Sequence, residues 1–167
     1  IRDRDMWALG TGRTWGANAF CLPGGFVTAV TDAEEFIATP DRVWVLGAGN
    51  NRNYIRWIYT DGSGHTAEDY QYPKWHGESI GFWDGDTLVV ETTNYSTKSD
   101  FMGSSENFKL VERFTRVGPE TLNWQLTFTD PTHWTRPWTV VISLKKSEDA
   151  VFEFACHEGN IAMEGIL

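Results

Sequence analysis

The sequence predicts an all-β fold, built as a single antiparallel meander that closes into a barrel. Three observations support this prediction. Within 83–93, an Asp-Gly turn separates two runs of alternating strand residues, which is a strong hairpin signal. A second hairpin is expected around the Gly-Pro-Glu turn at 118–120. The residues after that turn alternate as in a strand with one buried face, with apolar side chains at Leu122, Trp124, Leu126 and Phe128.

About nine strands are expected in chain order. They lie at 34–39, 42–46, 53–60, 79–83, 87–93, 108–117, 121–130, 138–145 and 151–156. Many short antiparallel strands must bury one face and hide their edges, and a closed sheet does both. We therefore expect a calycin-like or lipocalin-like barrel over 34–160, within a single domain that spans 1–167. Glycines interrupt any regular period over 1–31, which predicts an irregular N-terminal arm.

Composition excludes some partners. A chain of 167 residues with 41% hydrophobic residues fits one globular domain with a sizeable core. No apolar run approaches the roughly 20 residues that span a bilayer, so no membrane span is expected. The net charge of -9, with only 14 Lys and Arg residues, argues against a nucleic-acid partner.

The cysteines and the first residue bear on cellular location. Cys21 and Cys156 either form a disulfide that closes a long loop or remain two free thiols, and both alternatives stay open. The chain begins at Ile1, so we interpret it as a processed or truncated product whose signal peptide lies outside the sequence. A periplasmic or secreted protein is expected.

Several segments resemble a widespread bacterial family of uncharacterised exported proteins. The resemblance rests on Gly-Ser-Ser-Glu-Asn at 103–107, Leu-Val-Glu-Arg-Phe-Thr-Arg at 110–116, Asp-Pro-Thr-His-Trp-Thr-Arg-Pro-Trp at 130–138 and Ala-Cys-His-Glu-Gly-Asn at 155–160. The hairpin at 79–90 and the Cys-Leu-Pro-Gly run at 21–24 belong to the same likeness. It implies an exported protein that carries a signal peptide, and it transfers no activity and no catalytic residue.

Charged residues within the predicted strands are candidates for acid/base chemistry. Four of them alternate with apolar neighbours and are expected to point inward: Arg56, Glu91, Glu112 and Glu158. Because a buried carboxylate needs a partner or a raised pKa, such a cluster is typical of proton-transfer sites, with Arg56 as electrostatic stabiliser. His157 beside Glu158 is a further candidate for proton transfer. The alternative is a structural ion-pair network, with Glu112 bound to Arg113 or Arg136.

Aromatic residues indicate the kind of ligand. Tryptophans within strands, Trp57, Trp124 and Trp138, are expected in the core. Rings in or near loops often line a cavity mouth, where they stack on a sugar or a flat apolar molecule. We assign that role to Trp75, Trp83, Trp134, Tyr59 and Tyr72.

A metal site is only weakly indicated, and no cofactor is expected. His76 and Glu78 share one face of an extended segment, and His157 is a possible third ligand across the barrel. The sequence lacks the close Cys and His spacing of common metal sites.

These features favour an exported small-molecule-binding barrel with an aromatic-rimmed cavity. The expected ligand is apolar and cyclic, or sugar-like such as a glycan. One alternative is an acid/base enzyme, a lyase, isomerase or hydrolase, that acts on the same kind of molecule. A second alternative is an accessory subunit of a larger complex. The oligomeric state stays open.

Overall fold

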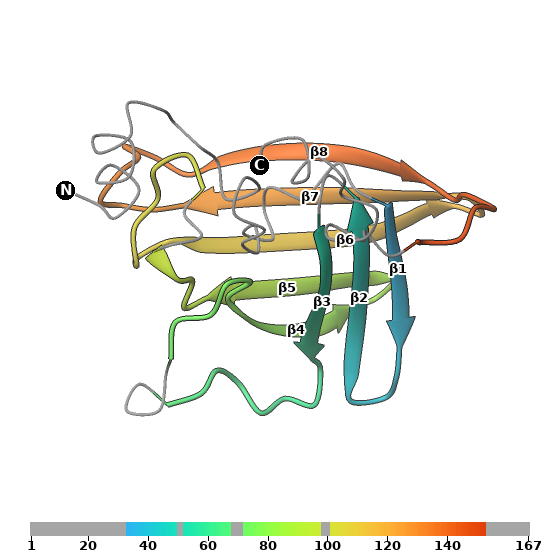
Figure 1. Ribbon diagram of the computed structural model, residues 1–167, viewed down its shortest axis with the longest axis horizontal. Coiled ribbons are helices and arrows are strands. Elements are labelled where there is room, and N and C mark those ends of the chain that lie inside the picture. The colour runs from blue at the N-terminus through green and yellow to red at the C-terminus, as the bar shows by residue number, and fades with distance from the viewer. Residues whose placement is uncertain (1–32, 50–51, 68–71, 98–100, 153–167) are drawn as a thin grey trace, which may run out of the picture.

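Eight strands follow one another in chain order in a single sheet that curls into a half-barrel (Figure 1). The computed structural model describes residues 33–49, 52–67, 72–97 and 101–152. The strands are β1 (Ala33–Ala38), β2 (Arg42–Gly49), β3 (Arg52–Tyr59), β4 (Glu78–Asp84), β5 (Thr87–Thr93), β6 (Lys109–Gly118), β7 (Thr121–Thr129) and β8 (Trp138–Lys145). The prediction of an all-β meander is confirmed.

The end of the described chain differs from the prediction. A ninth strand was expected at 151–156, but Val151 and Phe152 are not in a strand, and 153–156 lie outside the described residues. The predicted arm at 1–31 and both cysteines also lie outside them. Among the described strands, β1 and β8 pair on one side only, so the curled sheet is a half-barrel.

One strand pair is parallel, whereas an entirely antiparallel meander was expected. β3 pairs with β4 through Ile58 opposite Ser79 and Tyr59 opposite Ile80. The connection over 60–77 leads from the end of β3 to the start of β4, and β4 then runs in the same direction as β3. Parallel strands need a long connection of this kind. The other six neighbouring pairs are antiparallel.

The half-barrel has two groups of strands that face each other. In Figure 1, β1, β2 and β3 run across the direction of β5 to β8. Alternate side chains of the first group point inward and pack on the second group, and the Phe36 and Phe114 ring centroids lie 5.3 Å apart. The core between the groups consists mainly of Val43, Val45, Tyr54, Ile58, Leu88, Val90, Leu110, Phe114, Trp124 and Leu126.

An aromatic cluster fills one end of this core. Phe128 and Trp138 stack with ring centroids 4.1 Å apart, and Trp134 meets Phe108 edge to face at 5.9 Å. Phe101 stacks on Phe128 at 5.2 Å. The cluster ties the loop before β6 and the loop before β8 to the inner face of the sheet.

The structure corrects one of the three core tryptophan predictions. Trp124 is fully buried and Trp138 packs against the core, as expected. Trp57 is 47% exposed, so its assignment to the core was wrong. The inward positions of β3 are Tyr54, Arg56 and Ile58, and alternation therefore directs Trp57 to the outer face.

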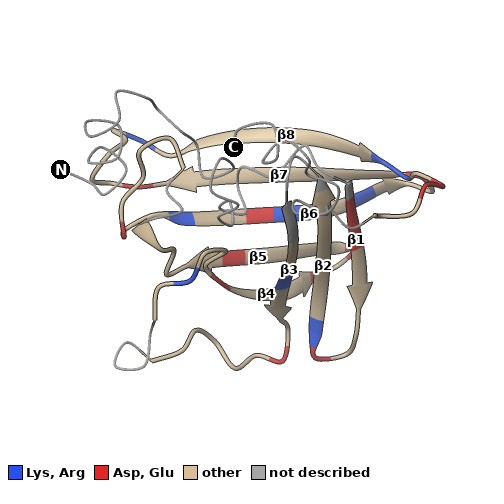
Figure 2. Ribbon diagram, in the orientation of Figure 1, with Lys and Arg blue, Asp and Glu red and all other residues tan. Residues whose placement is uncertain are grey.

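Charged residues lie mostly near strand ends and in the connecting turns (Figure 2). Within the described part of the chain, no helix has the length and apolar character needed to cross a membrane.

Candidate functional site

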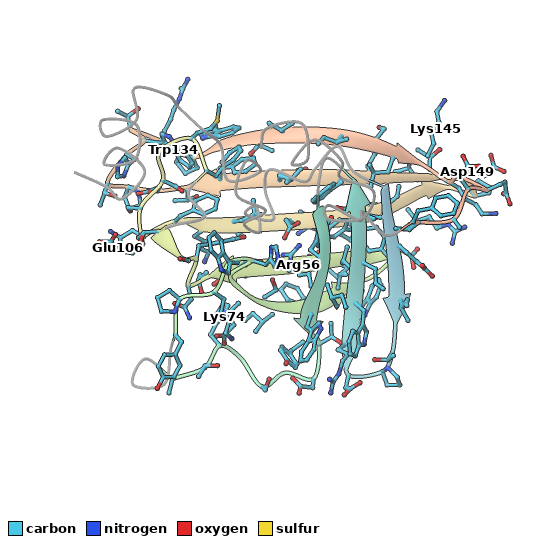
Figure 3. All side chains as sticks on the ribbon, viewed as in Figure 1. Arg56, Lys74, Glu106, Trp134, Lys145 and Asp149 are labelled. Atoms are coloured by element: carbon cyan, nitrogen blue, oxygen red, sulfur yellow. The ribbon has the colours of Figure 1, made fainter. Side chains whose placement is uncertain are left out.

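A buried ion pair joins the two groups of strands. Arg56 on β3 is 2% exposed and Glu112 on β6 is fully buried. Arg56 Nη1 donates to Glu112 Oε1 at 3.0 Å, and Arg56 Nη2 pairs with Glu112 Oε2, so the contact is bidentate. Figure 3 shows the Arg56 side chain in the middle of the molecule. The expectation that both residues point inward agrees with this placement.

Hydroxyl and indole groups complete the hydrogen bonds of this pair. Arg56 Nε donates to Ser79 Oγ at 2.9 Å, and Arg56 Nη2 donates to Thr92 Oγ1 at 2.6 Å. Ser79 Oγ and Thr92 Oγ1 lie 2.9 Å apart and share a hydrogen bond. Trp124 Nε1 donates to Glu112 Oε1 at 3.1 Å. These contacts offset the cost of burying both charges.

The surroundings of the pair keep the guanidinium charged. Burial disfavours a charged Arg56, but the attraction and hydrogen bond of Glu112 outweigh that effect and raise the pKa of Arg56. Burial also raises the pKa of the nearby Tyr95 phenol. Thr92 lies close to the Tyr95 hydroxyl without forming a hydrogen bond of normal geometry. The whole arrangement is suited to holding two layers together.

A second polar cluster lies on the opposite, outer face of β4 and β5. Glu78 and Glu91 sit there, and His65 from the 60–77 connection lies between them. His65 Nδ1 is 3.9 Å from Glu78 Oε1, and His65 Nε2 is 3.6 Å from Glu91 Oε1. Both distances exceed those of a hydrogen bond. His65 thus lies beside both carboxylates without hydrogen-bonding either one.

Glu78 is the most firmly held member of this outer cluster. The Thr66 backbone N–H donates to Glu78 Oε1 at 2.6 Å, and Lys74 Nζ donates to Glu78 Oε2 at 3.1 Å. Burial opposes ionisation, but the Thr66 and Lys74 contacts outweigh it and lower the pKa of Glu78 to about 2. Glu91, by contrast, is 37% exposed and pairs with Lys109.

A third buried carboxylate, that of Asp130, joins the loop before β6 to the loop before β8. Asp130 accepts hydrogen bonds from the Ser105 backbone N–H at 2.6 Å and from Thr132 Oγ1 at 2.6 Å. Burial again opposes ionisation, and these donors outweigh it and lower the pKa of Asp130 to about 2. His133 Nδ1 lies 3.6 Å from Asp130 Oδ2. Asp130 thus stabilises the loops around the aromatic cluster.

A hollow of about 670 Å³ opens at the end of the half-barrel where the β4–β5 and β6–β7 turns meet β1. Its walls are largely apolar and come from both groups of strands. The main lining residues are Phe36, Val43, Trp83, Leu88, Phe114 and Leu122, with Asp86 and Arg116 as the charged ones. Trp83 is 55% exposed.

The five predicted rim aromatics do not gather at one mouth. Trp83 lines the hollow, whereas Trp134 lies in the aromatic cluster at the other end of the half-barrel (Figure 3). The Tyr59 ring centroid lies 5.6 Å from the Arg42 guanidinium on the outer face of β3. Trp75 is half-buried and Tyr72 is 77% exposed, and neither lines the hollow.

The predicted acid/base residues are also separated. Arg56 and Glu112 meet inside, but Glu91 lies on the outer face of β5. His157 and Glu158 lie outside the described residues. The sequence proposed Arg113 or Arg136 as the structural partner of Glu112, but Arg113 pairs with Asp84 at 2.8 Å. The approach of His65 to Glu91 was not predicted, because a loop residue carries no periodic signal.

The residues considered for a metal have other surroundings. The His76 ring centroid lies 5.6 Å from that of Tyr54, and the Glu78 carboxylate binds Thr66 and Lys74. Among the described residues, no three His, Cys, Asp or Glu side chains are arranged to hold a metal ion.

Comparisons with protein-family models, curated proteins and solved structures found no match to this chain. The fold and the two faces of the sheet therefore define it only as a curled β half-barrel with an apolar hollow at one end.

Because Thr92 hydrogen-bonds to the buried ion pair and Thr93 does not, valine substitutions at these two positions should affect stability differently. Thr92→Val removes an acceptor of Arg56 inside the core, so we expect the free energy of unfolding to fall by about 1–3 kcal/mol. Thr93→Val is the matched control, because Thr93 points to the other face of β5, and its effect should stay within about 0.5 kcal/mol. Urea unfolding measures both. Equal losses would contradict the assigned role of Thr92.

The two lowered pKa values predict how stability depends on pH. The folded pKa values of Glu78 and Asp130 lie below the ordinary values of 4.5 and 3.8, so each carboxylate stabilises the fold above its ordinary pKa. That contribution is lost as the pH falls through the ordinary value toward about 2. Glu78→Gln and Asp130→Asn should each flatten this fall in the free energy of unfolding, measured in urea.

Glu120→Gln makes the same charge change as Glu78→Gln on an exposed turn and is the control. Its unfolding free energy should depend on pH as in the wild type. If the unfolding free energy of Glu78→Gln and Asp130→Asn also depended on pH as in the wild type, the contacts assigned to the Glu78 and Asp130 carboxylates would be contradicted.

Proposed function

We propose that the protein binds a small, largely apolar cyclic molecule in the hollow at the end of the half-barrel. The observation that carries this proposal is the lining of the hollow, which is contributed by both groups of strands and is mostly aromatic or aliphatic. Its volume of about 670 Å³ lies in the range of ordinary ligand pockets, about 300–1,000 Å³.

The polar residues at the hollow indicate a ligand without a net charge. Arg116 donates through Nε to the Gly118 carbonyl at 3.3 Å and through Nη2 to the Pro119 carbonyl at 2.6 Å. Its guanidinium is therefore engaged in the β6–β7 turn, and Asp86 brings an opposite charge to the same hollow. Trp83, half-exposed at the edge, offers a flat apolar ring and one N–H donor.

Binding is better supported than acid/base catalysis. Neither Arg56 nor Glu112 lines the hollow, and the Glu112 carboxylate is committed to Arg56 and Trp124. Glu91 lies on the other face of the sheet, bound to Lys109. A molecule in the hollow would therefore meet apolar walls rather than the carboxylates that the enzyme hypothesis requires. Export and the family resemblance remain predictions from the sequence.

Filling the hollow tests the proposal. Ala38 on β1 is exposed and lines the hollow, so Ala38→Trp is expected to place an indole in the space that a ligand would occupy. N-phenyl-1-naphthylamine is a suitable uncharged cyclic probe, because its fluorescence rises in apolar surroundings. We expect the wild type to bind it and Ala38→Trp to bind it at least about tenfold more weakly in a fluorescence titration.

Val141→Trp is the matched control for this experiment. Val141 is an exposed residue of β8 that does not line the hollow, so the same substitution there should leave probe affinity unchanged. Thermal unfolding of both variants establishes that each is folded. Equal affinity in wild type and Ala38→Trp, or no binding by the wild type, would contradict the proposal.

A further inference from the structure

The outer face of β1, β2 and β3 carries several exposed large apolar residues. Strand alternation sends Phe36, Val43 and Ile58 inward and their neighbours outward. Three of the outward residues are 43–57% exposed, namely Ile37, Ile55 and Trp57. Exposed large apolar residues that gather on one surface often mark a binding site.

The residues of this face form ordered rows across the strands. Ile37 is opposite Trp44, and Trp44 is opposite Trp57, so the three lie side by side. The Trp44 and Trp57 ring centroids are 5.2 Å apart, with an angle of 52° between the rings. In the next row, Arg42 lies opposite Tyr59. We call Ile37, Arg42, Trp44, Ile55, Trp57 and Tyr59 the aromatic face.

The charged member of the aromatic face, Arg42, is held in place by its neighbours. The Arg42 guanidinium lies 5.9 Å from the Trp44 ring centroid and 5.6 Å from the Tyr59 ring centroid. Arg42 Nη2 also donates to Asp41 Oδ2 at 2.8 Å, and Thr39 Oγ1 donates to Asp41 Oδ1 at 3.0 Å. Both charged side chains remain partly exposed, so their unused donors and acceptors are open to a partner.

The charge of the aromatic face limits the chemistry of its partner. Arg42 is the one cation among the outward side chains described on β1, β2 and β3, Asp41 pairs with it, and Glu35 on β1 adds an exposed outward carboxylate opposite Leu46. An anionic partner, such as a nucleic acid or an acidic lipid surface, would meet no net positive charge and a chain of net charge -9. A second copy of this chain would carry the same negative charge and be repelled. An uncharged partner meets no such repulsion and can cover the apolar area that Ile37, Ile55 and Trp57 expose.

We propose that the aromatic face binds an uncharged polysaccharide. A pyranose ring has apolar C–H faces and a rim of hydroxyl groups. Its faces match the 47% exposed Trp57 ring and the half-buried Trp44 ring beside it, which supply apolar contact area with little loss of side-chain freedom. Its hydroxyls match the Asp41 carboxylate and the Arg42 guanidinium at the border. Rows of side chains on successive strands would contact successive sugar rings.

This site is separate from the proposed ligand hollow. The hollow uses Phe36 and Val43, which lie on the inner face of β1 and β2, whereas Ile37 and Trp44 lie on the outer face. A substitution on the aromatic face therefore leaves the lining of the hollow intact. Polysaccharide binding and binding of a small apolar molecule can be measured and lost independently.

The test is affinity electrophoresis in native gels that contain an uncharged polysaccharide. The panel is hydroxyethyl cellulose, fully N-acetylated glycol chitin and amylose. We expect at least one to retard the wild type, with a dissociation constant that changes little when salt is raised, because no ion pair is involved. Trp57→Ala and Trp44→Ala should each weaken binding at least about tenfold. Both positions are outward, so both variants are expected to fold, which thermal unfolding checks.

Phe82→Ala is the matched control, because Phe82 is a 61% exposed aromatic residue of β4 outside the aromatic face. It should bind the polysaccharide as the wild type does. The proposal is overturned if no polysaccharide of the panel retards the wild type, or if Phe82→Ala loses affinity as strongly as Trp57→Ala. It is also overturned if sedimentation shows a dimer that Trp57→Ala dissociates, since the face would then bind a second copy.

Discussion

The buried contact between Arg56 and Glu112 is the constraint on which the arrangement of the sheet depends. It connects β3 with β6, strands from the two groups that face each other across the core. Two charges taken out of water are costly unless each is paired and hydrogen-bonded. Ser79, Thr92 and Trp124 meet that condition only when the strands that carry them are in the observed register. The network therefore favours one way of laying β1 to β3 across β5 to β8.

The parallel pairing of β3 and β4 determines where the apolar hollow and the aromatic face lie. It brings Ser79 on β4 next to Ile58 on β3, within reach of Arg56. The sheet then changes direction (Figure 1), so β1 to β3 close over one side of the core, and their outward residues Ile37, Ile55 and Trp57 are 43–57% exposed. The apolar hollow lies between the two groups at one end, and the aromatic face lies on the outer side of β1 to β3. The two ligands that we propose, a small apolar molecule and a polysaccharide, would occupy different surfaces of one fold.

The strands were predicted from local sequence patterns. The site was predicted only in part, because it depends on contacts between residues that are distant in the sequence. Alternation with Leu110 and Phe114 was enough to place Glu112 inside, because inward and outward positions depend only on neighbours in the strand. The same reasoning failed for Glu91. Val89 is buried at 6% exposure on the outer face, so its apolar character did not indicate the core. The partner of Glu112 lies 56 positions away, and the approach of His65 depends on the path of a loop. Neither has a local signature.

The most direct test of the central interaction is the coupling energy between Arg56 and Glu112 from a double-mutant cycle in urea. Arg56→Met and Glu112→Met each leave one buried charge without a partner, so each should cost about 3–5 kcal/mol. The double variant leaves no unpaired charge, and its cost should be at least about 2 kcal/mol smaller than the sum of the single costs. Single costs that add within about 0.5 kcal/mol would show that the two residues do not act as a pair and would contradict the account.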